Sequence, residues 1–404
     1  MNRSYYGHLK PCPDVVALRR HFHRHPELRF AEAGTAECIA DFLRPMGFEV
    51  QTGVARTGVV ASMQRGSGGY HVALRADMDA LPIPDSKDVE YRSTVEDTSH
   101  ACGHDAHVAI AMATAAELAA ADDWEGRVTL VFQPAEEVPF GAKSGAREMI
   151  AAGLFDLVPP IDAMFGLHCW PWLDVGQVGA ERGPAMAAKD AFQLCVTGKA
   201  AHVATPHEGV DAILVAARIV QAIHQLVSRR VAPGATAVVH VGTIEGGRSQ
   251  SVLADDVRLT GTIRTHDEAV RSSLKAAVEA IAASEGAMWG ATAVVTWANE
   301  MPSLINDRRL VDLARTVLIE PAPGAPEYVD IEDSPLTTDD FAVLAERVPA
   351  LYMKLGVRGP VRGHLALHTS GFDIDEDALQ IGIIALERLS RAVLDGALAG
   401  ARRA

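Results

Sequence analysis

The sequence has few basic residues and few cysteines for its length. Of 404 residues, 37 are Lys or Arg and 52 are Asp or Glu, which gives a formal charge of −15. Nucleic acids and anionic membranes both attract basic surfaces, so this balance disfavours either as a partner. The five cysteines are odd in number and scattered along the chain. That usage is typical of a reducing compartment rather than of a disulfide framework.

Long apolar runs are missing as well. No run approaches the about 20 residues that a membrane-spanning helix needs. The N-terminal MNRSYYGHLKPCPD lacks the apolar central segment of a signal peptide. We therefore expect a cytoplasmic protein that acts on a small molecule. At 404 residues the chain exceeds the size of one growing core, so two domains are expected.

The first part of the chain alternates between strand and helix patterns. Apolar residues recur with helical spacing over 35–46, and Gly47 follows as a C-terminal cap. The further predicted strands are Phe48–Val54, Gly58–Met63, Tyr70–Leu74, Arg127–Phe132 and Ile161–Leu167, and the helices are His104–Ala120 and Lys143–Ala152. This alternation predicts an α/β fold with a largely parallel sheet covered on both faces.

The pattern changes at about Lys189 and returns after Pro302. Between them the predicted elements are Ala191–Thr197, Val210–Arg229, Thr236–Ile244, Val257–Arg264, Glu268–Ala287 and Thr292–Ala298. Their order is βαββαβ, the split arrangement of ferredoxin-like domains. Later predicted elements are a helix over Asn306–Ile319, a strand over Ala350–Leu355 and a helix over Glu376–Leu394. We predict a larger domain formed by residues 1–188 and 301–404, with residues 189–300 inserted as a small module.

Residues that ligate metals or move protons follow three of the predicted strands. Asp77 and Asp79 follow the first, Glu136 and Glu137 the second, and His168 the third. Ligands of open parallel sheets bind beyond the carboxyl ends of the strands. Three such endings at one edge therefore indicate a functional site.

The motif Cys102-Gly103-His104 lies between two of these strands, just before a predicted helix. A thiol and an imidazole on either side of a glycine can both reach one side of a turn. Together with a carboxylate they suit zinc, and manganese, cobalt or nickel are alternatives. A buried cysteine beside a helix-capping histidine is the other interpretation of this short motif. Because Glu137 and His168 also follow predicted strands, a metal site is the favoured interpretation.

Glu136 and Glu137 are adjacent, and neighbouring residues that leave a strand tend to point in opposite directions. One ion is therefore not expected to bind both equally, and the pair predicts one ligand and one general base. A solvated acidic loop is the alternative. Asp77 and Asp79 are interpreted either as ligands or as carboxylates that orient a ligand histidine.

The remaining histidines carry weaker signals. His21, His23 and His25 fall in the first helical stretch, far from any strand end, and are interpreted as structural. His202 lies in a predicted loop of the inserted module, and His368 lies late in the chain. The spacing alone does not identify His202 or His368 as a functional residue.

Ten motifs in order resemble the dinuclear metallopeptidase family that includes hippurate hydrolase, aminoacylases and plant auxin-conjugate amidohydrolases. They are HFHRHPELRFAE, ALRADMDALP, HACGHDAHVA, VFQPAEE, FGLHCWP, GKAAHVATPHEGVDAI, GTIEGG, LTGTIRT, TTDDFAVLAERVP and LHTSGFDIDED. The resemblance covers nearly the whole chain. It implies a zinc-aminopeptidase-like catalytic domain with a ferredoxin-like lid, and a homodimer joined through that lid.

The resemblance also implies roles for individual residues. It implies two divalent ions, which are zinc or manganese, with cobalt or nickel as alternatives. The implied ligands of these ions are Cys102, His104, Glu137, His168 and His368. Glu136 corresponds to the general base. His202 corresponds to a residue that helps to bind the scissile carbonyl, often across a dimer interface. Arg264 corresponds to an anchor for a substrate carboxylate.

Two positions depart from the family pattern. Ser251 stands where relatives usually carry an asparagine near the substrate, and Asp339 stands where they carry a glutamate. Serine leaves more room there or admits a water molecule.

We therefore predict an amidohydrolase of the EC 3.5.1 kind that cleaves a small N-acyl amino acid. In this hypothesis a water molecule shared by two ions attacks the amide, and Glu136 accepts its proton. One alternative is hydrolysis of another C–N bond, as in the deamination of an aromatic amine. The other is a metal-containing binding protein without catalysis.

Overall fold

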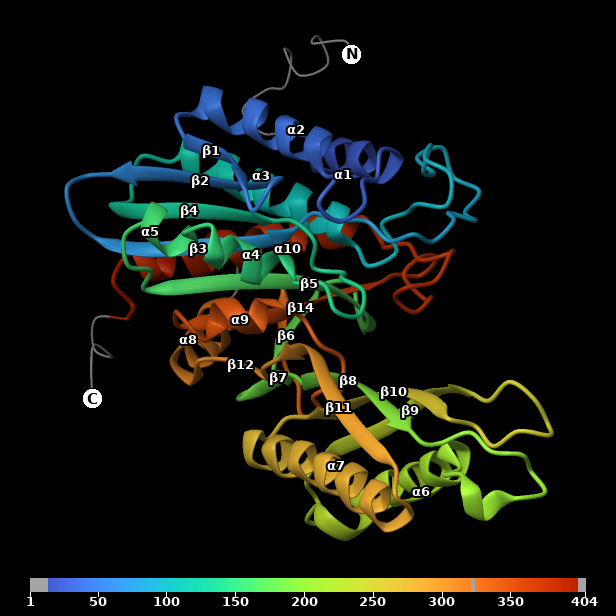
Figure 1. The fold of residues 1–404 in the computed structure, drawn as a ribbon. Coiled ribbons are helices and arrows are strands. Elements are labelled where there is room, and N and C mark those ends of the chain that lie inside the picture. The colour runs from blue at the N-terminus through green and yellow to red at the C-terminus, as the bar shows by residue number, and fades with distance from the viewer. Residues whose placement is uncertain (1–13, 321–323, 399–404) are drawn as a thin grey trace.

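The computed structural model describes residues 14–320 and 324–398. Cys12 and the N-terminal segment on which the expectation of no signal peptide rests lie outside the described residues. Figure 1 shows a larger body built on a broad sheet and a smaller one below it, and short connecting strands join the two. No helix in the described ranges is long and apolar enough to cross a membrane.

An eight-stranded mixed sheet forms the centre of the larger body. Its strands are β1 (Glu49–Val54), β2 (Gly58–Arg65), β3 (Tyr70–Asp77), β4 (Gly126–Gln133), β5 (Ala163–Asp174), β6 (Gln177–Ala180), β13 (Glu327–Asp330) and β14 (Ala350–Arg358). The order is β1-β2-β4-β3-β5-β14-β6-β13. β4, β3, β5 and β14 are parallel, whereas β2 is antiparallel to both of its neighbours and β6 to β14.

The prediction of a largely parallel sheet therefore holds only for the centre. Between β1 and β2 there are only the residues 55–57, and a loop of that length joins antiparallel strands. A parallel pair needs a crossover of a dozen or more residues.

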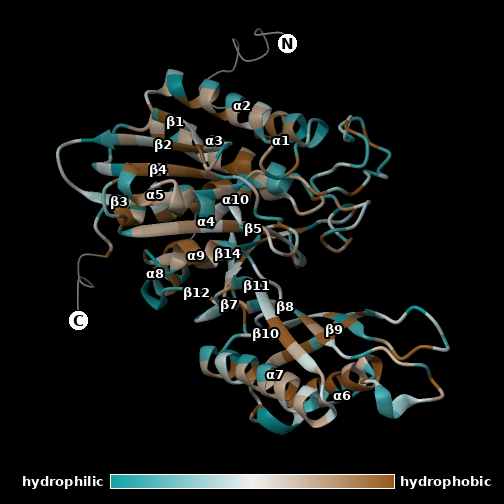
Figure 2. Cartoon of the chain, in the orientation of Figure 1, coloured by the Kyte–Doolittle hydropathy of each residue, from teal (hydrophilic) through white to brown (hydrophobic). Residues whose placement is uncertain are grey.

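Helices cover both faces of this sheet, as predicted. One face packs against α1 (Val15–Arg24), α2 (Ala33–Leu43), α3 (His104–Ala120), α8 (Arg308–Ile319) and α10 (Asp377–Leu394). The other face packs against α4 (Gly145–Ala151), α5 (Leu154–Leu157) and α9 (Phe341–Ala345). Each face has its own buried apolar cluster, because successive strand side chains point to opposite sides. Figure 2 shows the apolar colouring concentrated along the central strands.

The smaller body is an antiparallel four-stranded sheet with two helices on one face. Its elements are β8 (Ala188–Thr197), α6 (Ala212–Arg230), β9 (Ala237–Gly246), β10 (Asp256–Thr265), α7 (Glu268–Trp289) and β11 (Thr292–Met301). The strand order is β11-β8-β10-β9. Within the described chain, no helix covers the other face, which we call the open face. β7 (Pro184–Met186) pairs with β12 (Leu304–Ile305) where the two bodies meet.

The predicted strand over Ile161–Leu167 is too short. β5 continues to Asp174, so His168 lies inside the strand rather than after its end. The continuation is stabilised by pairing with β14, in which Lys354 and Leu355 lie opposite His168 and Cys169.

Candidate metal centre

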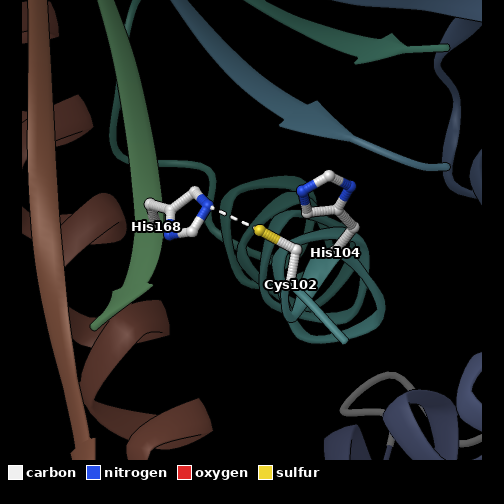
Figure 3. Close-up of side chains that lie close together, drawn as sticks. All are labelled: Cys102, His104 and His168. Carbon is white, nitrogen blue, oxygen red and sulfur yellow. Dashed lines mark hydrogen bonds between the residues drawn. The ribbon is translucent and has the colours of Figure 1, made fainter. Parts of the chain in front are cut away.

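The five predicted metal ligands come together in two groups that share one thiol. Cys102, His104 and His168 form the first group, and Cys102, Glu137 and His368 form the second. Within each group the ligand atoms lie within 4.8 Å of one another. Figure 3 shows the Cys102 side chain pointing to His168, with His104 beside it at the start of α3.

The shortest distances centre on the sulfur and on the Glu137 carboxylate. Cys102 Sγ lies 3.5 Å from Nε2 of His168 and 3.3 Å from Nε2 of His368. That same His368 nitrogen lies 2.7 Å from Oε1 of Glu137. A sulfur placed between two imidazoles in this way can contact two ions at once.

Gly103 allows the chain to turn tightly between Cys102 and His104. Its φ of 89° is left-handed, a conformation that glycine adopts at no steric cost. A Cβ at this position would lie 2.9 Å from Cβ of Cys169 on β5, closer than atoms of this kind approach. The glycine therefore lets the loop press against the strand that carries His168.

His104 has one nitrogen engaged and one left over. Its Nδ1 donates a hydrogen bond to the carbonyl oxygen of Asp79 at 2.8 Å, whereas the buried Nε2 makes no hydrogen bond and lies 3.6 Å from the Asp77 carboxylate. Burial lowers the pKa of His104, but the charge of Asp77 and the hydrogen bond to Asp79 raise it to about 10. The carboxylates that favour a proton on this nitrogen would also attract a metal ion, which releases the proton when it binds. The residues present therefore fit a divalent ion.

His168 and His368 are also held in place by the backbone. Nδ1 of His168 donates to the carbonyl oxygen of Cys169 at 2.8 Å, which directs Nε2 towards Cys102. Burial and the charge of His107 lower the pKa of His168 well below its usual range, so the ring is neutral, as a metal ligand must be. His368 has a left-handed φ of 62°, and its backbone N–H donates to Ala101 at 2.8 Å. Such strained residues concentrate at functional sites.

Asp77 and Asp79 support the site from behind. Asp79 accepts hydrogen bonds from the backbone N–H groups of Glu136 and Glu137, at 3.1 and 2.9 Å. Asp77 lies 2.6 Å from Nδ1 of His107 and is also bonded to Arg75. Of the two interpretations of these aspartates, the contacts favour orientation over ligation.

Sequence reasoning missed His107. Its Nε2 accepts a hydrogen bond from the backbone N–H of Cys169 at 2.9 Å, so its Nδ1 carries the proton donated to Asp77. With both nitrogens engaged, His107 is not available as a ligand, and it ties β5 to β3 instead. The spacing of three residues from His104 on one helix face was the signal that could have identified it.

Glu136 and Glu137 differ in their partners. Burial raises the pKa of Glu137, but the hydrogen bond to His368 and the charges of His368 and His104 together outweigh it, and the pKa is lowered. Burial, and then the charge of Glu137, raise the pKa of Glu136 well above its usual range. Its carboxylate has no hydrogen-bond partner in the described part of the chain, although it approaches His104. One carboxylate is thus engaged with the second ligand group and the other is available to bind a proton.

Asp339 is held in a buried network. Its carboxylate accepts a hydrogen bond from the hydroxyl of Tyr352 at 2.9 Å and lies 3.1 Å from the guanidinium of Arg75. Arg75 lies equally close to Asp340. The aspartate in place of the family's glutamate is therefore accommodated by fixed partners.

The predicted residues of the small module, His202, Ser251 and Arg264, belong to neither ligand group. His202 is exposed, and its Nδ1 accepts a hydrogen bond from the backbone N–H of Ala204. The next residue, Val203, donates its backbone N–H to the carbonyl oxygen of Ser251. The structure thus places His202 and Ser251 side by side. Arg264 donates to the carbonyl oxygen of Leu336 at 2.8 Å, where the two bodies meet.

The histidines of the first helix have structural contacts, as predicted. His23 is buried and lies 2.6 Å from Asp105 and 3.2 Å from Asp85. His25 is bonded through Nδ1 to the backbone oxygen of His21. In the described ranges none of the three helix histidines joins a group of candidate ligands.

Known proteins resemble this chain over almost its whole length. Residues 73–392 match the model of peptidase family M20/M25/M40. The thermostable carboxypeptidase 2 of Saccharolobus solfataricus is 36% identical over 375 residues, which cover 92% of this chain and 93% of that protein. The N-acetyl-L-cysteine deacetylase of Bacillus subtilis is 36% identical over 389 residues, covering 94% and 88%.

A solved structure also resembles this chain over almost its whole length. A dinuclear metal-binding peptidase of the M20 family from Bacillus subtilis superposes with a TM-score of 0.80 at 31% identity, covering 94% of this chain and 98% of that one. Fold, ligand groups and relatives together define a metal-dependent amidohydrolase. More particularly, the chain belongs to peptidase family M20/M25/M40.

Proposed function

We propose that this protein uses two metal ions to hydrolyse the amide bond of a small N-acyl amino acid. The observation that carries the proposal is the pair of ligand groups around Cys102, with the Glu136 carboxylate within 4.8 Å of His104 and Glu137 but not hydrogen-bonded within the described chain. The names of two relatives support the substrate class. A carboxypeptidase and an N-acetylcysteine deacetylase both cut an amide whose nitrogen belongs to an amino acid with a free carboxylate.

Cys102, His104 and His168 would hold one ion, and Cys102, Glu137 and His368 the other. The mixture of thiolate, imidazole and carboxylate suits zinc or manganese, and cobalt or nickel are alternatives. When bound, the ions supply Lewis acidity that makes a water molecule acidic enough to attack an amide near neutral pH.

Glu136 takes the proton of the attacking water and delivers it to the leaving nitrogen. Its burial among other carboxylates raises its affinity for a proton, which suits a group that must carry one between two atoms. His202 stabilises the negative charge that develops on the substrate oxygen. Arg264 holds the substrate carboxylate through charge-assisted hydrogen bonds.

We further infer that residues 189–300 form a ferredoxin-like lid that joins two copies of the chain, and that residues 1–188 and 301–404 form a zinc-aminopeptidase-like domain. The strand order β11-β8-β10-β9 supports the first inference. β9 is an edge strand with exposed Val238 and Ile244, and such edges pair readily with another strand. His202, which lies between β8 and α6 of the smaller body and belongs to neither ligand group of its own chain, would then act in the partner's site.

Mixing two inactive variants tests this arrangement. If His202 acts across the interface, His202→Ala and Glu136→Gln chains that exchange subunits should form mixed dimers with one intact site. We expect an activity of up to about a quarter of the wild-type value, since random exchange gives half mixed dimers. Each variant incubated alone is the control. An active monomer in sedimentation at the assay concentration would contradict the arrangement.

Arg264→Lys tests the carboxylate anchor. A guanidinium holds a carboxylate through two parallel hydrogen bonds, which lysine cannot reproduce. We expect KM to rise about tenfold, with a smaller change in kcat. A tenfold change corresponds to the free energy of about one charge-assisted hydrogen bond. Substrates whose carboxylate is capped as an amide should be poor for the wild type and insensitive to this change. Equal losses with free and capped substrates would show that Arg264 only holds Leu336.

A second candidate reaction is hydrolysis of another C–N bond, which the Ser251 departure leaves open. The alternative of a binding protein without catalysis is set aside, since the chain belongs to a peptidase family. A panel of N-acyl amino acids, offered to protein loaded separately with zinc and manganese, tests the proposal. Release of a free amino acid supports amide hydrolysis, whereas ammonia released from an aromatic amine would favour the second candidate. Cytoplasmic location and the absence of nucleic-acid or membrane partners stay predictions from composition.

A further inference from the structure

Two cations lie opposite each other on the open face of the small sheet. Lys189 of β8 pairs in register with Arg264 of β10. Their neighbours show which way they point. Asp190 forms ion pairs with Arg271 and Lys275 of α7, and Ile263 belongs to the core beneath the helices. Because side chains alternate along a strand, Lys189 and Arg264 point to the opposite, open face.

Neither cation has a carboxylate partner in the described part of the chain. Among the described residues no carboxylate oxygen lies within 4.0 Å of Lys189 Nζ or of the Arg264 guanidinium, and the one hydrogen bond of the Arg264 side chain is to the carbonyl of Leu336. Both side chains are half-buried. Like charges directly opposite on neighbouring strands are destabilising. A half-buried pair without a counter-charge is therefore a candidate binding site for an anion.

The open face of the small sheet is turned towards the larger body, because α6 and α7 lie on the side away from it (Figure 1). Burial and the charge of Arg264 lower the pKa of Lys189, whereas Glu136 and Glu137 act on it in the opposite direction. Lys189 is thus within the electrostatic reach of the metal centre. Its other neighbour in the sheet is Met301 of β11, which leads back into the larger body. An anion held between Lys189 and Arg264 would lie on this open face.

We propose that Lys189 and Arg264 together bind a leaving amino acid that carries two carboxylates, so that the preferred substrates are N-acyl derivatives of acidic amino acids. This inference rests on the proposed function, in which Arg264 holds the α-carboxylate. Lys189, on the neighbouring strand, is then within reach of the side-chain carboxylate of the same amino acid. A lysine suits this second position, because its flexible stem can follow side chains of different length.

The test compares N-acetyl-L-glutamate with N-acetyl-L-glutamine, which have similar shapes and differ in one charge. We measure kcat/KM with metal-loaded wild-type protein. We also measure Kd by calorimetry in a Glu136→Gln background, in which turnover does not interfere. The wild type should prefer the glutamate compound by about tenfold or more, the size of a hydrogen bond between charged groups. Lys189→Gln should abolish this preference and Lys189→Arg should retain part of it.

Arg258→Gln is the matched control. Arg258 lies on the same strand and the same face as Arg264, six residues away, or about 20 Å at the rise of a strand. It carries the same charge, and its loss should leave the preference unchanged.

The outcomes separate the two levels of the proposal. No preference in the wild type, no binding of either compound, or an equal loss for both compounds in Lys189→Gln would overturn the role of Lys189. The last result would mean that both cations hold the single α-carboxylate. Preferential binding that depends on Lys189, without hydrolysis of either compound, would support the anion site and refute the proposed function.

Discussion

Glu136→Gln should keep its metal ions and lose about 10²–10⁴ in kcat, the range measured for removal of a general base. The glutamine has the same shape but cannot accept a proton from water. Glu136 lies beside both ligand groups, and its carboxylate makes no hydrogen bond within the described chain, so its replacement should disturb few contacts. Metal content by mass spectrometry, together with turnover of an N-acyl amino acid, checks both parts.

Glu137→Gln is the matched comparison, since it makes the same chemical change one residue away. Glu137 lies 2.7 Å from His368, so this variant should lose one ion. The backbone N–H groups of both glutamates bond to Asp79, which should hold the loop in either variant. Two variants with the same metal content and the same rate would refute the division into one ligand and one base.

Cys102→Ala should remove both metal ions and all measurable activity. Cys102 is the one residue common to both ligand groups, so its loss weakens each of them. By contrast, His368→Ala and His168→Ala each remove a ligand from one group and should each lower the content by about one ion per chain. Metal content after dialysis against a weak chelator distinguishes these results.

Cys169→Ala provides the control for loss of a buried thiol. Cys169 is as buried as Cys102 and lies next to His168 in the sequence, yet its sulfur belongs to no ligand group. Burial raises the pKa of the thiol in both cysteines, so it is the neighbouring ligand residues that distinguish Cys102 from Cys169. This variant should keep both ions. Full metal content and normal rates in Cys102→Ala would eliminate the proposed centre.

The ligand residues could be predicted because their chemistry is rare and local. Cys102 and His104 are fixed by one glycine turn, and the helix that follows begins and ends at His104 and Ala120, as predicted. His368 was different, since no local pattern distinguishes it. It reaches the site through a loop that bonds to Ala101, a long-range contact that only the fold creates. The resemblance to a family supplied what periodicity could not.

The strands and residues that the sequence analysis did not predict correctly have identifiable physical causes. β6, β7, β12 and β13 have between two and four residues, too few for any period to appear. β5 was predicted too short because its apolar run ends at Leu167, although pairing with β14 continues beyond it. His107 was overlooked because its role depends on two partners distant in sequence, Asp77 and Cys169.

Metal titration of stripped protein tests the central claim most directly. Zinc or manganese is added in steps, and release of the amino acid from an N-acyl amino acid is followed. Because two ligand groups share Cys102, we predict negligible turnover without metal and a rate that rises until about two equivalents per chain are bound. Full turnover in the stripped protein, or a rate that saturates at one equivalent, would contradict a two-metal amidohydrolase.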